Sequence, residues 1–370
     1  MSIFAGVAAD VCALLLASDQ PTNALECLEK GRAVIIGQLI DRGTIVVVNI
    51  TKFRSDAVLV SRGAVKALSL PGLRASDAEA WLGKKWTGRG VRRDGHAQKN
   101  KEYLKYLAWL WDVSTENAFS KAVSSYTPSI KALWYAQERA RATDGARGAL
   151  LIVAMPTTPG QVAQPDSRTQ QDTRKPPDLP GVAEETKKIT DIVNGHVPIE
   201  PLDLPSVDQA VDKLTDCYIA HFTCHGLTDH ADPSNSGLIL QKRGEGQEAE
   251  QDRLTVHRGS ELSLAHARIA YLSACSTAEN GAARLSDEVI HVVSGFQVAG
   301  FPYVVGCLWP SIDWVRVEVS SGFYGSLLRR RGARWDGGEV ARAVREAVMA
   351  VREAEMDRPL AWAQFVHFGA

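Results

Sequence analysis

Two short motifs in this chain each end a strongly apolar stretch with a side chain that can do chemistry. Residues 218–226 run to His225-Gly226, and residues 268–276 carry Cys275 among small residues. Both stretches are apolar and contain β-branched residues, which predicts buried strands. In open α/β sheets, reactive groups gather at the edge where the carboxyl ends of parallel strands meet. We therefore expect His225 and Cys275 to lie together as base and nucleophile.

A paired cysteine and histidine predict acyl transfer from a peptide bond. A free thiol with a pKa of ~8.5 is mostly protonated at neutral pH, and a neighbouring imidazole can take its proton. His225 would then return that proton to the departing amine. We expect the backbone N–H groups of Gly226 and Cys275 to bind the oxyanion. Glycine after the histidine lets the chain turn and the substrate approach closely.

A zinc site is the alternative for the histidine motif. His221, Cys224, His225 and His230 cluster as zinc ligands can. Alternate residues of a strand face opposite sides, so His221 and His225 share a face that Cys224 does not. Two ligands make a poor structural zinc site, and we predict no metal and no cofactor. Free cysteines in strands are often core residues, which is our interpretation of Cys224 and Cys307.

The composition is that of a globular protein with ample material for a core. The chain has 370 residues, 45% of them hydrophobic and 23% charged, and a net charge of −1. The balanced charge predicts no general attraction to nucleic acid or anionic membrane. No apolar run approaches the ~18 residues that span a bilayer, and the N-terminus lacks a basic, signal-like region. Six scattered cysteines without Cys-x-x-Cys spacing favour a reducing compartment, so we expect a cytoplasmic protein.

Strands and helices alternate along the sequence, which predicts an α/β fold with a mostly parallel sheet flanked by helices. Besides the two motif strands, the expected strands are 45–50, 56–60, 149–154 and 303–308. The expected helices are 5–17, 22–40, 76–86, 101–123, 182–194, 206–215, 285–298, 312–331 and 338–355. Both motifs therefore lie at strand ends inside one sheet.

Three stretches are predicted to be loops. Residues 156–181 are rich in Pro, Gln, Thr and Asp, and residues 241–253 are charged and contain glycine. Residues 84–101 are basic, and we interpret them as a solvated loop. They lack the interleaved aromatic residues of a stacking platform, so we predict no nucleic-acid binding.

The ordered set of motifs resembles the CHAT family, a branch of the caspase-like cysteine peptidases often found behind TPR helices. The motifs that carry the resemblance are His225-Gly226, Ser273-Ala274-Cys275, 287–291, 299–301, 304–310 and 366–369. Together they cover roughly the C-terminal 240 residues, the scale of a large domain. His225 and Cys275 are 50 residues apart (275 − 225), a spacing similar to that of caspases.

The resemblance implies a caspase-like (caspase-hemoglobinase) fold over residues 43–370, with His225 and Cys275 as the catalytic pair. Residues 1–42 resemble the last helix pair of a TPR array or form a helical cap, since one pair cannot build a solenoid. The expected partners are a protein or peptide substrate and TPR-type proteins. The family implies roles in regulated proteolysis, cell death or defence.

Two further residues are candidates for substrate contacts. Trp309 follows the strand 303–308, where caspase-like folds build one wall of the substrate groove. A core aromatic residue at a strand exit is the alternative. Asp287 could select a basic side chain or cap the helix 285–298, and we favour the cap.

One departure from the family divides the functional hypotheses. After residue 112, relatives carry a further segment with a strand, and nothing like it occurs here. A missing strand leaves an unpaired sheet edge and removes part of the groove wall. The intact pair of His225 and Cys275 favours a cysteine endopeptidase, whereas the missing segment favours a non-catalytic interaction or scaffold module. A nucleotide-binding protein is disfavoured, because the chain lacks a Walker A motif and a Gly-x-Gly-x-x-Gly turn.

Overall fold

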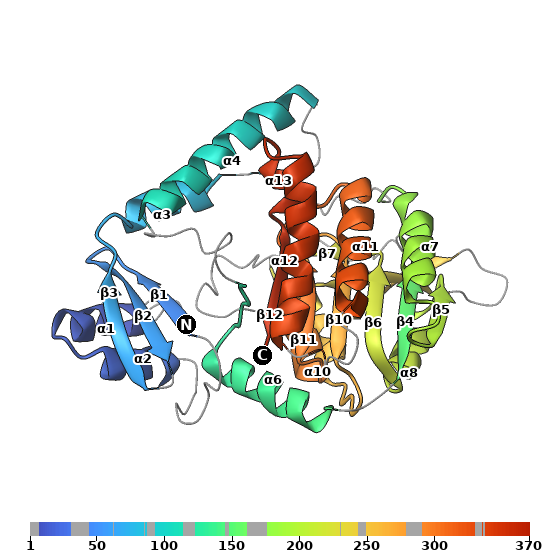
Figure 1. Ribbon diagram of the computed structural model, residues 1–370, viewed down its shortest axis with the longest axis horizontal. Helices are drawn as coiled ribbons and strands as arrows, with labels where there is room; N and C mark the ends of the chain where they lie inside the picture. The colour runs from blue at the N-terminus through green and yellow to red at the C-terminus, as the bar shows by residue number, and fades with distance from the viewer. Residues whose placement is uncertain are drawn as a thin grey trace. The chain divides into compact units, whose positions relative to one another are not determined.

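The chain forms two compact units, which Figure 1 shows in a computed structural model. The first unit comprises residues 1–122, 127–134 and 284–288, and the second comprises 123–126, 135–283 and 289–370. The predicted boundary between residues 42 and 43 concerns the extent of the family domain and stays a prediction. The structure describes residues 7–30, 44–61, 63–84, 86, 93–113, 123–144, 148–160, 176–229, 231–242, 249–278, 291–329, 335 and 337–370.

The first unit contains a three-stranded antiparallel sheet with two helices packed on it. The sheet has the order β1-β2-β3, and its helical partners are α1 and α2. Their bounds are α1 Val7–Ala17, α2 Pro21–Lys30, β1 Ile45–Ile50, β2 Ser55–Ser61 and β3 Ala64–Ser69. Apolar side chains of the helices, among them Leu16 and Leu25, bury Val58 and Val60 of β2. The predicted strands 45–50 and 56–60 are confirmed, whereas β3 was missed because most of its residues are exposed.

The interpretation of residues 84–101 as a solvated loop was wrong from Arg93 onward. Helix α4 (Arg93–Val113) begins there and follows α3 (Ala75–Leu82). The described side chains fit an amphipathic helix, because Lys101 and Lys105 are exposed while Tyr103 is buried. Aromatic rings also gather beside the basic stretch, with Lys84 Nζ 4.4 Å from the Trp81 ring. The clustered rings are Trp81, Trp86, Tyr103, Tyr106 and Trp109.

A six-stranded sheet forms the centre of the second unit, in the order β12-β11-β10-β6-β4-β5. All neighbouring pairs are parallel except β11 and β12, so the predicted α/β class with a mostly parallel sheet is confirmed. The strands are β4 Ala149–Ala154, β5 Ile199–Asp203, β6 Cys217–Thr223, β10 Ile269–Ser273, β11 Tyr303–Cys307 and β12 Phe365–Gly369. Strands β4, β6, β10 and β11 are buried along almost their whole length because helices cover both faces of the sheet.

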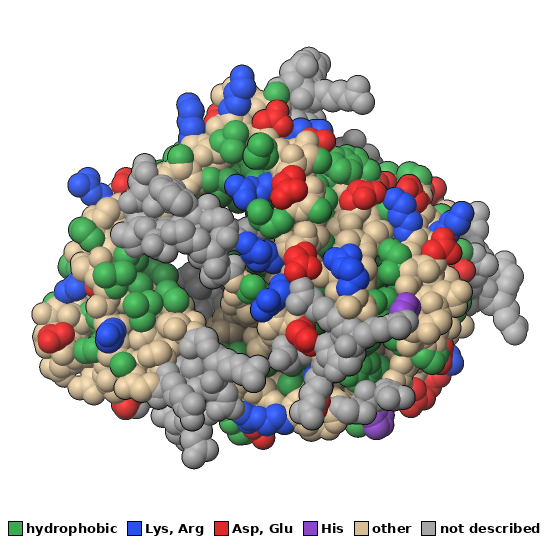
Figure 2. All heavy atoms as spheres, viewed as in Figure 1, with side chains coloured by type: hydrophobic (Ala, Val, Ile, Leu, Met, Phe, Trp, Pro, Cys, Tyr) green, Lys and Arg blue, Asp and Glu red, His purple; other side chains and the backbone are tan. Residues whose placement is uncertain are grey.

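Helices cover both faces of this sheet, and Figure 1 shows α7, α11 and α12 side by side in front of it. Helices α8, α9 and α10 supply apolar side chains to the core on the opposite face. The bounds are α6 Ile130–Ala142, α7 Gly181–Val193, α8 Val207–Leu214, α9 Val256–Ser260, α10 Val292–Ala299, α11 Asp313–Arg329, α12 Gly337–Ala354 and α13 Pro359–Trp362. Within the described ranges, no helix combines the length and the apolar character needed to cross a bilayer. Acidic and basic side chains are interspersed on the face in Figure 2, in keeping with the net charge of −1.

A small antiparallel sheet follows β6 directly. It contains β7 (His225–Leu227), β8 (Gly237–Lys242) and β9 (Glu250–Thr255), with β8 in the centre. The predicted loop at 241–253 was therefore too wide, because its two ends continue paired strands. The charged sequence of β9 concealed a strand whose side chains are mostly half-buried.

The outer edge of β12 pairs with the segment that precedes α6. The backbone N–H of Tyr126 donates to the His367 carbonyl at 2.8 Å, and that of Gly369 donates to the Tyr126 carbonyl at 3.1 Å. Ser125 adds a hydrogen bond to the Gly369 carbonyl. These contacts satisfy part of the strand edge that the missing family segment was expected to leave open.

Two buried histidines near this edge predict loss of stability in acid. His291 caps α10 by accepting from the Ser294 N–H, and His367 hydrogen-bonds Ser125; both rings are 2% exposed. Burial lowers the pKa of His291 to about 4 and that of His367 to about 3, from an ordinary 6.5. Below pH 6.5 the unfolded chain binds protons that the folded chain does not, so stability is full above pH 6.5 and falls toward pH 4.

At pH 5 we expect each of these histidines to cost about 2 kcal/mol of unfolding free energy relative to pH 7.5. His291→Asn keeps a capping side chain and removes one titrating group, so it should remove about half of that loss. Urea denaturation at pH 5 and pH 7.5 measures this loss of unfolding free energy. The control is His196→Asn, because His196 is exposed. An unchanged pH dependence in His291→Asn would contradict the prediction.

Candidate active site

The sheet brings His225 and Cys275 to the same edge at the same level. Strands β6 and β10 are parallel neighbours, with Thr223 paired to Ser273 at their carboxyl ends. His225 and Cys275 each lie two residues further on, so the same offset of 50 relates them. Both residues are partly exposed. The sequence prediction that the two motifs meet at the carboxyl edge therefore agrees with the register.

Gly226 shows how closely the two chain segments approach. A Cβ atom added at Gly226 would overlap the carbonyl oxygen of Cys275, with the Cys275 carbonyl carbon 3.2 Å and nitrogen 3.5 Å away. Only glycine leaves room for a backbone at this distance. The peptide backbone that carries the thiol is thus packed against the residue that follows the imidazole.

The imidazole of His225 is oriented by a backbone carbonyl. His225 Nε2 lies 2.8 Å from the carbonyl oxygen of Pro177. A carbonyl oxygen only accepts, so Nε2 must carry the proton in this hydrogen bond. Nδ1 is then the ring atom that can take a proton from a thiol. Asp229, four residues after His225, accepts hydrogen bonds from the N–H groups of Ala231 and Asp232.

The Pro177 segment belongs to a stretch predicted to be loose, and its described parts are tied down. The Leu179 N–H donates to the Pro156 carbonyl at 2.8 Å, and the Thr158 N–H donates to Asp178 at 2.9 Å. Leu179 is buried against Ala154. The base of the segment is therefore held at the carboxyl end of β4, next to the histidine strand.

The turn after Cys275 is also fixed on both sides. Ser276 has a φ of 56°, in the left-handed region that costs a non-glycine residue on the order of 1–2 kcal/mol. Thr277 accepts from the Cys307 N–H at 2.9 Å, and the Ala278 N–H donates to the Cys307 carbonyl at 2.9 Å. Strand β11 therefore supports a strained turn directly behind the thiol, as occurs at functional sites.

Burial separates Cys275 from most of the other cysteines. Cys12, Cys217, Cys224 and Cys307 are buried, whereas Cys27 and Cys275 are half-buried. Burial raises the pKa of the Cys12 thiol to about 11 and that of Cys217 to about 12. It also raises the pKa of the Cys224 and Cys307 thiols, in agreement with our interpretation of both as core residues. Of the four strand-end thiols in the second unit, Cys275 is the accessible one.

Trp309 lies at the same sheet edge as the pair. In the register of β10 and β11, Tyr271 pairs with Val305, so the two strands are offset by 34 residues (305 − 271). Cys275 and Trp309 are separated by the same 34 residues. The indole is half-buried, and its Nε1 donates to the Leu360 carbonyl at 2.8 Å. A fixed, partly exposed ring at this edge fits the wall of a groove, and its role in substrate binding stays a prediction.

Two predicted assignments have no structural test. Asp287 lies outside the described residues, as does the first part of the predicted helix 285–298, whose described part begins at Val292. His291, rather than Asp287, caps that described helix. The oxyanion roles of the Gly226 and Cys275 N–H groups also stay predictions.

The histidine motif does not form a zinc site in the described part of the chain. No three His, Cys, Asp or Glu side chains gather as metal ligands there, and His230 lies outside it. His221 is fully buried instead, 3.4 Å from a Glu185 oxygen and 3.2 Å from the Tyr324 hydroxyl. It faces α7 and α11, whereas Phe222 and Cys224 belong to the core on the opposite face.

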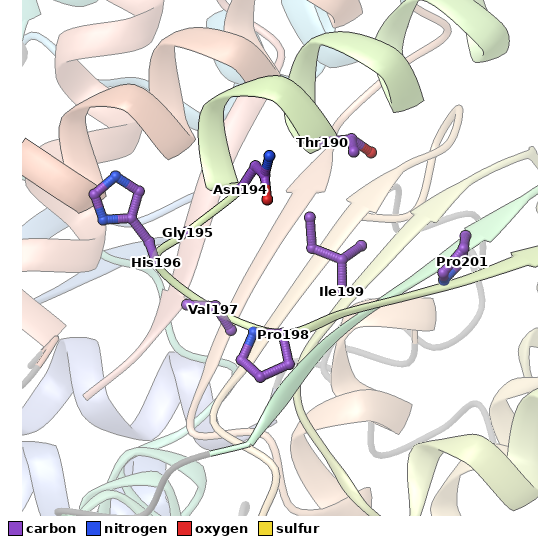
Figure 3. A pocket seen from close by; sticks show the side chains of 8 residues that line it. All are labelled: Thr190, Asn194, Gly195, His196, Val197, Pro198, Ile199 and Pro201. Carbon is purple, nitrogen blue, oxygen red and sulfur yellow. The ribbon is translucent and has the colours of Figure 1, made fainter.

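A shallow pocket of about 610 Å³ lies elsewhere, at the turn from α7 into β5 (Figure 3). Asn194, Pro198 and Ile199 are among the side chains that line it. These residues lie at the amino end of β5. Since parallel α/β sheets bind ligands at the opposite, carboxyl end, we do not assign this pocket to the reaction.

Sequence reasoning missed the Pro177 carbonyl and the buried charges beside the site. A backbone acceptor has no side-chain signature, and Pro177 lies in a polar stretch. Glu185 did leave a signal, because it occupies the apolar stripe of α7 with Val182, Ile189 and Val193. A carboxylate at such a position must be paired inside the protein.

Several solved structures have a similar chain path at low sequence identity. The Arg-specific cysteine proteinase gingipain R matches 65% of this chain and 52% of its own, with 11% identity and a TM-score of 0.43. A complex of the Porphyromonas gingivalis RgpB pro- and mature domains matches with 12% identity and a TM-score of 0.42, over 65% of this chain and 53% of that one. The Saccharomyces cerevisiae separase–securin complex matches 66% of this chain and 14% of its own, with 15% identity and a TM-score of 0.40.

No match to this chain was found among curated proteins. The sequence profile of the CHAT domain matches residues 107–370, the greater part of the chain. That range contains β6, β10 and the two motifs that end at His225 and Cys275. The predicted resemblance is therefore confirmed, and the chain belongs to the CHAT domain family.

Proposed function

We propose that this protein is a cysteine endopeptidase in which Cys275 is the nucleophile and His225 is the general base and acid. The observation that carries the proposal is the close packing of Gly226, the residue after His225, against the Cys275 backbone. The partial exposure of both side chains, and the hydrogen bond from His225 Nε2 to Pro177, support it further.

The proposed reaction begins with transfer of the Cys275 Sγ proton to His225 Nδ1. The thiolate attacks the carbonyl carbon of a peptide bond, and backbone N–H groups stabilise the resulting oxyanion. The C–N bond then breaks as Nδ1 returns the proton to the leaving amine, which leaves a thioester on Cys275. Water, deprotonated by His225, attacks the thioester and releases the carboxylic acid and the free thiol. No step needs a metal or cofactor.

The biological setting of the proposal follows from the family. We propose a protein or peptide substrate, a TPR-type partner, a cytoplasmic location, and a role in regulated proteolysis, cell death or defence. The competing proposal is an interaction or scaffold module with the same fold. It is favoured by the missing family segment after residue 112.

Labelling with a peptidyl acyloxymethyl ketone distinguishes these two functions. We expect the parent protein to be labelled at Cys275, and Cys275→Ala and His225→Ala to remain unlabelled, because the probe needs an activated thiolate. Cys307→Ala is the control, since this thiol is buried and should leave labelling unchanged. Equal labelling of the parent and both site variants would favour the scaffold.

A further inference from the structure

A buried cluster of charged and polar side chains lies against the strand ends that carry the proposed pair. Glu185 on α7 and Arg316 on α11 are 1% and 2% exposed, and His221 on β6 is fully buried. Glu185 accepts a hydrogen bond from the Thr223 hydroxyl at 2.8 Å. The Nη1 atom of Arg316 lies 3.5 Å from the Ser273 carbonyl oxygen. The cluster thus reaches the last residue of each strand, two positions before His225 and Cys275.

Both charged partners are ionised in this cluster. Burial raises the pKa of Glu185, but the hydrogen bond and charge of His221, together with the charge of Arg316, outweigh it and hold that pKa below its usual range. Burial lowers the pKa of the Arg316 guanidinium, yet the charges of Glu185 and Cys275 outweigh it and raise that pKa. The α7–α11 layer therefore holds a fixed cation and a fixed anion behind the sheet edge.

The Arg316 cation lies within electrostatic range of every thiol at this edge. Burial raises the pKa of Cys224 and of Cys307, and the Arg316 charge acts on both in the opposite direction. Cys224 and Cys307 are fully buried, whereas Cys275 is half-buried. The thiol on which the Arg316 charge can influence chemistry is thus Cys275.

A contribution to stability does not explain such a cluster. Replacing a buried ion pair by apolar side chains of similar volume is often neutral or stabilising, because desolvation of the charges offsets their attraction. The guanidinium is also fixed in place, since Nη2 lies 2.5 Å from an Asp313 oxygen. A fixed cation beside a site where negative charge develops is a recognised way to stabilise that charge.

We propose that Arg316 is a positioning residue whose buried cation, balanced by Glu185, favours the thiolate form of Cys275. The proposal goes beyond the proposed peptidase function and rests on it only in taking Cys275 as the nucleophile. Cys224 just after β6, Cys307 at the end of β11 and Arg316 on α11 interact electrostatically with Cys275. The other charged or titratable groups that the described elements bring to this edge include His225 on β7 and Glu185 on α7.

The test is the pH dependence of Cys275 alkylation by iodoacetamide, read by peptide mass spectrometry in a Cys27→Ser background. Glu185→Gln keeps the shape of the side chain and removes the anion, so the midpoint of the alkylation curve should shift to lower pH. Arg316→Met removes the cation, so the midpoint should shift upward, with alkylation on the order of ten-fold slower below it. Arg316→Lys keeps the charge and should remain near the parent.

Opposite shifts separate an electrostatic role from a structural one, because loosening of the site would move both variants in the same direction. Glu318→Gln is the matched control, since Glu318 also lies on this helical layer and its side chain is 52% exposed. If Arg316→Met fails to fold, the other two variants still test the inference: Glu185→Gln should shift the midpoint to lower pH, and Arg316→Lys should leave it near the parent value. Unshifted midpoints, or shifts of one sign, would overturn the inference.

This experiment is independent of peptidase activity. If peptide-probe labelling does not depend on His225 while the iodoacetamide midpoints move as stated, the proposed function fails and the role of Arg316 stands. If the probe labels as proposed and the midpoints do not move, the role of Arg316 fails alone.

Discussion

His225→Ala should slow labelling of Cys275 by a peptidyl acyloxymethyl ketone by ~10²–10⁴-fold, the usual contribution of a positioned general base. Nδ1 is the ring atom left to accept the thiol proton, because Nε2 donates to the Pro177 carbonyl. His225→Gln should lose as much as His225→Ala. A glutamine amide can keep the hydrogen bond to Pro177 but cannot take up a proton at neutral pH.

The measured quantity is the second-order rate constant of labelling, with thermal unfolding recorded for each variant. His196→Ala is the control, because this exposed histidine lies near the amino end of β5, at the far end of the sheet from the pair. A His225→Gln variant that labels at the parent rate would show that His225 does not activate the thiol of Cys275.

Gly226→Ala should abolish rapid labelling for a different reason. The added methyl group would overlap the Cys275 carbonyl oxygen, so one of the two segments must move. A displacement on the order of 1 Å at a reacting centre can cost ~10²-fold in rate. Overpacking of this kind also costs about 1–3 kcal/mol of stability. Gly226 has no positive φ, so the effect comes from space and not from backbone strain.

Gly160→Ala provides the matched comparison, since nothing lies within 4 Å of a Cβ added there. It should label and unfold like the parent. The outcome that contradicts the packing argument is a Gly226→Ala protein that is stable and labels at the parent rate. Retained stability with lost labelling would locate the whole effect in the geometry of the pair.

Periodicity was sufficient to predict four helices of the second unit with nearly correct bounds. The expected helices 182–194, 206–215, 312–331 and 338–355 correspond to α7, α8, α11 and α12 within two residues at each end. Their apolar faces repeat at helical spacing because each covers one side of a sheet. Strands β5 and β9 escaped prediction since they lie at sheet edges or carry charged residues, where burial imposes little pattern.

The candidate site was predictable where side-chain chemistry marks it. Cys275 and His225 follow apolar strands, and their equal distance from the paired ends of β6 and β10 follows from that position. The partner of His225 was not predictable, because it is a backbone carbonyl brought in from residue 177 by the fold. Arg316 resembles a surface charge in sequence, and its burial depends on how α7 and α11 pack over the sheet.

In the proposed function, the sulfur of Cys275 and the imidazole of His225 act together on a peptide. A crystal structure of the protein after reaction with a peptidyl chloromethyl ketone tests this most directly. We expect a covalent bond from Cys275 Sγ to the inhibitor, His225 Nδ1 within hydrogen-bond reach of the reacting atoms, and Nε2 still donating to the Pro177 carbonyl. An inhibitor bound to Cys27, or an imidazole turned away from the modified sulfur, would contradict it.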